Sequence, residues 1–400
     1  MEKEKIKKID SCFCPSRRAF DEMEKNGKKE KKRVFVMMSG GVDSSVAAGL
    51  LKKAGYDVLG VHLICWDEES FGCSAGEDRR DAERVAVILD IPFEVWDLKK
   101  EYKKKVFDYM ISEYKKGRVP NPDVMCNKKI KFGIFFKEAM RRGADYVATG
   151  HYARVECELK IGNGKFKGKK KEVFKLIEGK DKDKDQSYFL WTLGQKELSK
   201  TIFPLGKMLK SEVRREAKKM KLLNAEKKDS QGLCFIGKVD FQDFLRKKIK
   251  EKEGVIKDIK GKIIGKHKGS FYYSIGQRKN IGLLGGSEEP FYVLKKDLKK
   301  NELIVGKRNS KEAYFKKVVL KDINFIEEGV VDKLKRGKEK IWAKIRYRGE
   351  KLPVKLKKEK GKWVICFEKK AEFISVGQSA VFYLTGGELI GGGVFDRVLT

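Results

Sequence analysis

Apolar runs alternate with helix-like stretches from Arg33 to Leu98. The strand-like runs cover 34–38, 58–63 and 93–98, with a helix ending at Ala54 and another through 81–89 between them. This alternation is typical of a doubly wound parallel sheet, an α/β fold with helices on both faces. Ligands of such folds bind at the carboxyl ends of the strands, so we expect the functional loops at that edge.

Two helical patterns and a further strand follow, at 102–114, 131–142 and 146–149. Gly150 and His151 come directly after this strand, which predicts that they lie at the same edge of the sheet. A stretch rich in glycine and lysine then occupies 162–171, between strand patterns at 153–157 and 173–177. This arrangement predicts a hairpin tip, where lysines meet either RNA or solvent.

The pattern changes to short strands with glycine turns in the last part of the chain, at 254–256, 271–274, 291–294, 341–347, 363–367 and 379–383. Such spacing indicates a small β-rich domain followed by a β-barrel. We therefore predict a flexible extension at 1–32, a catalytic α/β domain at 33–240, a central domain at 241–310 and a barrel at 311–400.

The chain is strongly basic, with 93 Lys and Arg against 58 Asp and Glu and a formal net charge of +35. This charge favours a large anionic partner, either a nucleic acid or a membrane surface. The alternative is a lysine-rich background of solvated faces, because the lysine runs are scattered. No window of about 18 consecutive apolar residues occurs, so we expect a cytoplasmic protein without a membrane partner.

Eight cysteines are present, and no two have the Cys-x-x-Cys spacing. The three histidines, His62, His151 and His267, are not spaced beside them as zinc ligands. We expect no protein-bound metal, neither zinc nor an iron-sulfur cluster.

A small-residue turn, Ser39-Gly40-Gly41-Val42-Asp43-Ser44-Ser45, joins the first strand to the first helix. Glycines allow close backbone approach, and N–H groups at a helix start attract anions, so this turn predicts a phosphate-binding loop. It lacks the Gly-Lys-Ser/Thr of a Walker loop. The alternative is an ordinary glycine-rich turn. The loop resembles that of the N-type ATP pyrophosphatases.

Two cysteines lie in distinctive surroundings. Cys126 belongs to the segment 121–127, where Pro120 and Pro122 disfavour helix and predict a rigid loop that presents Asp123 and Cys126. Cys234 lies in the segment 229–237, between two glycines. Each cysteine taken singly is more often a small buried hydrophobe than a nucleophile.

Together these features resemble one family, the tRNA-uridine 2-sulfurtransferases or tRNA-specific 2-thiouridylases. The resemblance runs from Arg33 to the C-terminus and is carried by segments 38–45, 121–128, 149–153, 184–190, 229–237, 274–279, 346–348 and 377–381. It implies ATP as cofactor, with Mg²⁺ to offset phosphate charge, and two partners, a tRNA and a persulfide sulfur-donor protein.

The resemblance also implies a mechanism. The O2 atom of a wobble uridine attacks the α-phosphate of ATP, pyrophosphate leaves, and sulfur from a persulfide on Cys234 then replaces the oxygen at C2 with release of AMP. Either the persulfide attacks directly, or Cys126 attacks it and frees sulfide. Both versions leave a disulfide between Cys126 and Cys234. Asp123 is a candidate general acid or base, or it holds the loop.

Further roles follow from the resemblance. The expected ATP contacts are Met37, Met38, Ser39, Gly40, Gly41, Val42, Asp43, Ser44, Leu63 and Gly150. The expected tRNA contacts are Asn121, Pro122, Asp123, His151, Lys184, Asp185, Gln186, Arg346, Tyr347 and Gln378. From the residues alone, His151 is equally well a histidine at the rim that hydrogen-bonds to the backbone, 184–186 a surface turn, and Gln378 a barrel turn.

Two other functions compete with thiolation. Another N-type pyrophosphatase would adenylate a small molecule, yet it would need neither a cysteine pair nor a basic barrel. A basic RNA-binding protein with an idle loop would not need Asp43, Cys126 and Cys234 together.

Overall fold

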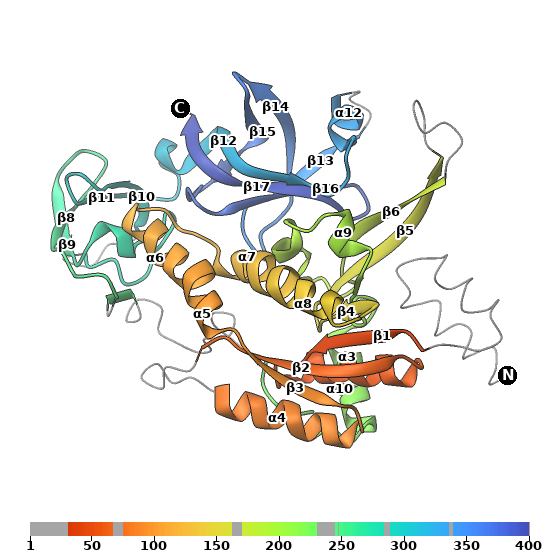
Figure 1. Ribbon diagram of the computed structural model, residues 1–400. Coiled ribbons are helices and arrows are strands. Elements are labelled where there is room, and N and C mark those ends of the chain that lie inside the picture. Colours follow the sequence, from red (N-terminus) through yellow and green to blue (C-terminus); the bar gives the residue numbers. More distant parts are fainter. Residues whose placement is uncertain are drawn as a thin grey trace.

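The computed structural model describes residues 31–66, 75–161, 170–229, 245–246, 248–283, 289–335 and 339–399. It consists of an α/β domain, a small β domain and a β-barrel (Figure 1). The described residues contain no helix that is both long and apolar enough to cross a bilayer. Residues 1–30 of the predicted extension at 1–32, and 162–169 of the predicted hairpin tip at 162–171, lie outside the described residues.

The first sheet has five parallel strands, so the predicted doubly wound fold is confirmed. Their order is β3 (Phe93–Asp97), β2 (Asp57–Ile64), β1 (Arg33–Met37), β4 (Tyr146–Ala148) and β7 (Thr201–Ile202). Consecutive strands run outward from β1 on one side, whereas β4 lies on its other side. The boundary between β1 and β4 is therefore the switch point where such sheets bind ligands.

Alternate residues of β1 enter two separate cores, because side chains of a strand point to opposite faces. Val34 and Val36 pack with the helices α3 (Val42–Lys53), α4 (Ala75–Ile88) and α10 (Lys210–Lys219). On the other face, Phe35 and Met37 pack with a second helical layer. This layer comprises α5 (Lys99–Tyr102), a π-helical turn (Lys103–Phe107), α6 (Asp108–Lys115), α7 (Pro122–Cys126), a π-helical stretch (Asn127–Phe135) and α8 (Phe136–Arg141).

The predicted rigid loop at 121–127 is wrong, because a helix begins there. Asn121 caps α7, and its Oδ1 accepts a hydrogen bond from the N–H of Val124 at 3.1 Å. Pro122 occupies the first helical position, where its missing N–H has no partner to lose. Pro122 therefore keeps the backbone of Asn121 out of the helical conformation, whereas the residues after Pro122 are helical. Cys126 consequently lies within a continuous helical stretch that runs to Arg141.

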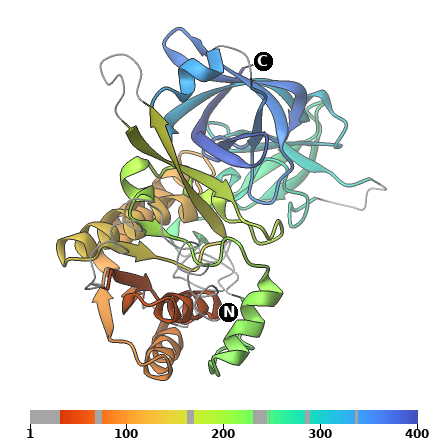
Figure 2. The same ribbon diagram turned by 90° about the vertical axis from the view of Figure 1, so that its right-hand side faces the viewer.

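A hairpin links the α/β domain to the barrel. Its strands are β5 (Ala153–Ile161) and β6 (Lys170–Glu178), and β6 pairs antiparallel with β17 (Glu388–Leu399) of the barrel. Figure 2 shows the hairpin extending beside the barrel above the α/β domain. After the hairpin come a short 3-10 helix (Ser187–Leu190) and α9 (Gln195–Leu198). Residues of this segment share a core with the barrel.

The small β domain has the strand order β10 (Tyr292–Asp297), β11 (Glu302–Gly306), β8 (Gly254–Lys257) and β9 (Ile263–His267). The predicted strand at 271–274 is wrong, because residues Ser270–Tyr272 form a 3-10 turn. Gly269, at φ 142°, redirects the backbone before this turn. The Ser270 N–H bonds to Asn301 rather than to a neighbouring strand.

The barrel closes because β12 pairs with both β15 and β17, which confirms the predicted C-terminal barrel. Around the barrel the order is β12 (Tyr314–Phe325), β15 (Lys362–Glu372), β14 (Leu352–Glu359), β13 (Ile341–Lys344), β16 (Ser379–Leu384) and β17. Two short helices, Lys311–Ala313 and α12 (Val330–Lys335), flank these strands.

All three histidines are buried, and burial lowers the pKa of each below 6.5. Because the unfolded histidines titrate near 6.5, the unfolded chain binds more protons than the folded one as the pH falls. We therefore expect the free energy of unfolding to decrease from about pH 7.5 to about pH 5.5, by up to roughly 1.4 kcal/mol per pH unit for each histidine.

Urea unfolding across this pH range measures the effect. The substitution His267→Gln should reduce the slope, since one of the three titrating groups is lost. A free energy of unfolding that stays constant over the range contradicts the prediction.

Candidate active site

The loop between β1 and α3 has a backbone that only glycine accommodates at one position. Gly40 has φ +79°, and a β-carbon there would lie 2.1 Å from the carbonyl oxygen of Asp78. Gly41 is extended and caps α3. The cradle is therefore shaped by the backbone, with the N–H groups of the helix start at its floor.

The serines hold this loop in shape. Ser44 Oγ donates to the carbonyl of Gly41 at 3.0 Å and accepts from the N–H of Ser39 at 3.1 Å. Ser45 Oγ donates to the same carbonyl at 3.0 Å. The loop is thus preformed, which lowers the ordering entropy lost when a phosphate binds.

A second segment supports the loop from behind. The amide nitrogen of the buried Asn224 donates to the carbonyl of Gly40 at 3.0 Å and to Ser45 Oγ at 2.9 Å. Lys227 forms ion pairs with Asp78 at 2.7 Å and Asp81 at 2.6 Å. Sequence reasoning missed Asn224 and Lys227, because no local pattern marks residues whose partners are so distant along the chain.

Asp43 connects the loop to a cluster of charges. Its Oδ1 accepts hydrogen bonds from the Tyr152 hydroxyl at 2.8 Å and from Lys210 at 2.7 Å. Lys210 also pairs with Asp229 at 2.7 Å, and Lys184 pairs with the same carboxylate at 2.6 Å. Burial opposes ionisation of Asp229, but these two lysines outweigh it and lower its pKa to about 2. Burial, together with Asp43, raises the pKa of Tyr152.

Gly150 brings the end of β4 against the start of α3. A β-carbon at Gly150 would lie 2.8 Å from the backbone carbon of Asp43 and from the nitrogen of Ser44. On the other side of the loop, Met37, Met38 and Leu63 have buried side chains. The side chains of these three residues therefore belong to the core, which leaves only their backbone atoms for a ligand.

The helix that carries Asp123 and Cys126 packs beside this rim. Cys126 is fully buried, and the amide nitrogen of Asn127 donates to the carbonyl of Asp123 at 3.0 Å. Further along this helix, the ring of Phe132 lies 6.1 Å from that of His151, next to Gly150. Cys234 lies outside the described residues, as does most of its segment.

Several predicted tRNA contacts bind other parts of the protein. His151 Nδ1 lies 2.6 Å from Thr149 Oγ1, and burial holds the pKa of His151 well below its usual value. The buried Asp185 accepts hydrogen bonds from Ser187 and Lys344. Gln186 accepts one from the N–H of Tyr152 at 3.1 Å.

The predicted contacts on the barrel differ in exposure. Arg346 is exposed, whereas the ring of Tyr347 is half-buried and lies 4.4 Å from that of Phe189. Gln378 donates from its amide nitrogen to two carbonyls of the α/β domain. Arg346 is thus the predicted barrel contact whose charge faces solvent.

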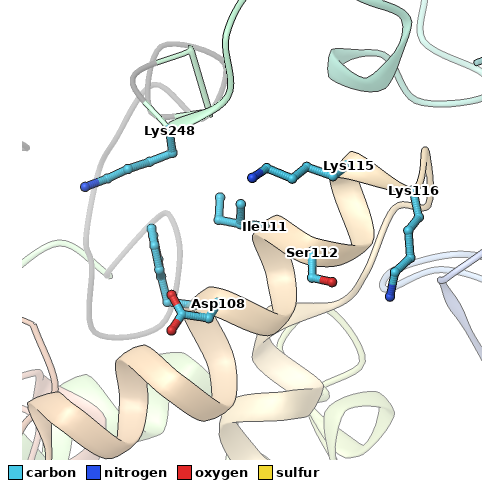
Figure 3. A pocket seen from close by; sticks show the side chains of 7 residues that line it. Asp108, Ile111, Ser112, Lys115, Lys116 and Lys248 are labelled. Atoms are coloured by element: carbon cyan, nitrogen blue, oxygen red, sulfur yellow. The ribbon is translucent and has the colours of Figure 1, made fainter.

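A cavity of about 540 Å³ lies apart from the loop, between α6 and Lys248 (Figure 3). It is lined by Phe107, Asp108, Ile111, Ser112, Lys115, Lys116 and Lys248. None of these residues belongs to the phosphate loop or to α7, so this cavity lies outside the candidate site. Within the described part of the chain, no group of three or more His, Cys, Asp or Glu could hold a metal ion.

Comparisons with known proteins agree with this architecture. Residues 32–238 match the family described as tRNA methyl transferase HUP domain, 242–307 its PRC-barrel domain, and 315–395 an aminomethyltransferase β-barrel domain. Fold and family models together define a protein with an α/β domain of the HUP type and two appended β domains.

Similar curated proteins identify the family within this class. The chain is 45% identical over 371 residues to the tRNA-specific 2-thiouridylase MnmA of Geobacillus thermodenitrificans, covering 92% of this chain and 95% of that protein. It is 44% identical over 374 residues to the MnmA of Enterococcus faecalis, covering 92% and 96%. The chain belongs to the tRNA-specific 2-thiouridylase family.

A solved structure, the U34-tRNA thiolase NcsA from Methanococcus maripaludis, is 18% identical with a TM-score of 0.36, covering 62% of this chain and 73% of that one.

The close approach of Gly150 to α3 generates a prediction. In Gly150→Ala the new methyl group must displace the first turn of α3, at a cost of about 1 to 3 kcal/mol in stability. We expect ATP affinity to fall at least tenfold, because the N–H groups of the loop move with that turn. Titration calorimetry with ATP measures the affinity.

Gly76→Ala is the matched control, since a β-carbon there meets nothing within 4 Å in α4. Its ATP affinity should equal that of the wild type. Equal ATP affinity of Gly150→Ala and Gly76→Ala would contradict the prediction.

Proposed function

We propose that the protein catalyses ATP-dependent 2-thiolation of the wobble uridine of tRNA. One structural observation supports this proposal in addition to membership of the family. The helix with Asp123 and Cys126 packs through Phe132 against His151, and the neighbouring Gly150 lies against the phosphate loop at Asp43. ATP activation and sulfur chemistry would therefore meet at one rim of the sheet.

In the first step, the uridine O2 attacks the α-phosphate of ATP and pyrophosphate leaves. The N–H groups of Gly40 to Ser44 would hold the phosphates at the positive end of the α3 dipole. Lys210 pairs with both Asp43 and Asp229, and its ammonium group would help to stabilise the charge of the departing pyrophosphate. The preformed cradle at Gly40 fits ATP, and Mg²⁺ bound to its phosphates would offset their remaining charge.

In the second step, sulfur replaces the activated oxygen. A sulfur-donor protein would load Cys234 as a persulfide, whose terminal sulfur reaches C2 directly or as sulfide after attack by Cys126. The persulfide S–S bond breaks, a Cys126–Cys234 disulfide forms, and AMP leaves with the oxygen. Because Cys126 is buried, we infer that substrate binding must uncover it before it reacts.

Asp123 is the candidate acid or base at this site. All three histidines of the chain are buried, with pKa values lowered by burial. Asp123 is partly exposed in the first turn of α7, the helix that also carries Cys126. This supports a role for Asp123 in proton transfer at the uridine.

The net charge of +35 supports tRNA as the substrate rather than a small molecule. The exposed Arg346 on the barrel and the lysines around the α6 cavity would meet phosphates. Lys184, Asp185 and Gln186 order a turn beside Tyr152, and we propose that this turn supports the RNA surface.

Substitutions should separate pyrophosphate release from sulfur transfer. We expect Asp43→Asn to abolish tRNA-dependent pyrophosphate release, since the charge that orients Lys210 is lost. Cys126→Ser and Cys234→Ser should keep pyrophosphate release but lose persulfide-dependent thiolation by at least about a hundredfold. Pyrophosphate assays and mass spectrometry of tRNA nucleosides measure the two steps.

Cys366→Ser, on β15 of the barrel, serves as the control and should retain both steps. Pyrophosphate release that does not depend on tRNA would instead favour adenylation of a small molecule. Normal thiolation by Cys234→Ser would exclude its role as the sulfur carrier.

A further inference from the structure

The barrel holds the chain segment that leads into α7. The N–H of Val119 donates to the carbonyl of Val376 at 2.8 Å. In the opposite direction, the Gln378 amide nitrogen donates to the carbonyls of Val119 at 2.9 Å and Pro120 at 3.2 Å. Three hydrogen bonds therefore join two successive residues of the α/β domain to one turn of the barrel.

We call this contact between 119–120 of the α/β domain and 376–378 of the barrel the joint. The two backbones lie close together there. Gly377 has φ +98°, and a β-carbon there would lie 3.0 Å from the backbone atoms of Val119. Gln378 is itself fixed within the barrel, because its N–H donates to Ser375 and its carbonyl accepts from the N–H of Phe395. The side chain of Gln378 thus extends from a rigid base.

Charged groups cross the same boundary. The buried carboxylate of Glu113, at the end of α6, pairs with Arg118 at 3.4 Å and with Lys321 of the barrel at 3.7 Å. Arg118 also lies 3.5 Å from Asp396 of β17. Ion pairs and hydrogen bonds therefore fasten 113–120 to the barrel from two sides.

This joint ends where the candidate catalytic helix begins. Pro120 is followed directly by Asn121, the cap of α7, and the helix carries Asp123 and Cys126. A shift of the carbonyls at 119 and 120 would therefore move the helix start, and small displacements of reacting groups reduce rates strongly.

We propose that Gln378 is a positioning residue, which sets the catalytic helix against the barrel rather than contacting tRNA through its amide nitrogen. This inference rests on the proposed thiolation. Binding of tRNA to the barrel would then be coupled to the placement of Asp123 and Cys126 through the joint.

Gln378→Leu tests the proposal, because it removes the donor while keeping a side chain of similar size. At saturating tRNA and ATP we expect the single-turnover thiolation rate to fall by about tenfold or more. The Kd for tRNA, measured by filter binding, should stay within about twofold of the wild type. Gln378→Lys restores a donor of similar reach and should recover most of the rate.

Gln195→Leu is the matched control. The Gln195 amide nitrogen also donates to two carbonyls, those of Phe174 and Ile326 on either side of the boundary, but away from α7. Gln195→Leu also removes the hydrogen bond that Gln195 Oε1 accepts from the N–H of Phe174, so it should destabilise the protein at least as much without changing the rate at saturation. An equal fall in rate in this variant would overturn the proposal, since the effect would then be general destabilisation.

Hydrogen exchange gives a measurement that does not depend on activity. In the protein without substrates, amides of 117–121 should exchange faster in Gln378→Leu than in the wild type and in Gln195→Leu. A raised Kd for tRNA with an unchanged rate would make Gln378 a tRNA contact and overturn the proposal, as would unchanged exchange. Absence of thiolation in the wild type would refute the proposed function, whereas the exchange result still tests the joint.

Discussion

Gly150 and the first turn of α3 lie so close together that a single methyl group between them would overlap the backbone. This contact sets the distance between β4 and the phosphate loop, and Tyr152 then reaches Asp43 from the same segment. Because the loop is also held from behind by Asn224, its shape does not depend on a bound nucleotide. The shape of the loop is therefore set by the sheet and by the segments that pack at its edge.

The α/β domain and the barrel are joined by more than a linker. Strand β6 pairs with β17, the buried Trp191 bonds to Ser379 of the barrel, and Gln378 returns to the segment before α7. Each neutral hydrogen bond contributes only about 1 kcal/mol, yet together with a shared apolar core they keep the two parts in register. The barrel and the proposed catalytic rim of the α/β domain are thereby held in one arrangement.

Sequence patterns predicted the sheets well and the site only in part. Strands such as β1 were evident because residues buried on both faces form continuous apolar runs. The helix at Pro122 was missed because proline at a first helical position looks like a helix breaker. Lys210 and Asn224 were missed because their partners lie far away in the sequence, and the burial of His151 and Asp185 depends on the same long-range packing. The family resemblance identified candidate ATP and tRNA contacts, but it did not reveal that the Gln378 side chain hydrogen-bonds to the protein's own backbone.

The pairing of β6 with β17 constrains the order in which the chain folds during synthesis. On the ribosome the hairpin emerges long before β17, so the edge of β6 that β17 later covers has no partner until β17 is synthesised. Unpaired edges of this kind recruit other strands. Strand β17 thus closes the barrel and also covers the end of β6 at Leu176 and Ile177, an edge that would otherwise favour association between nascent chains.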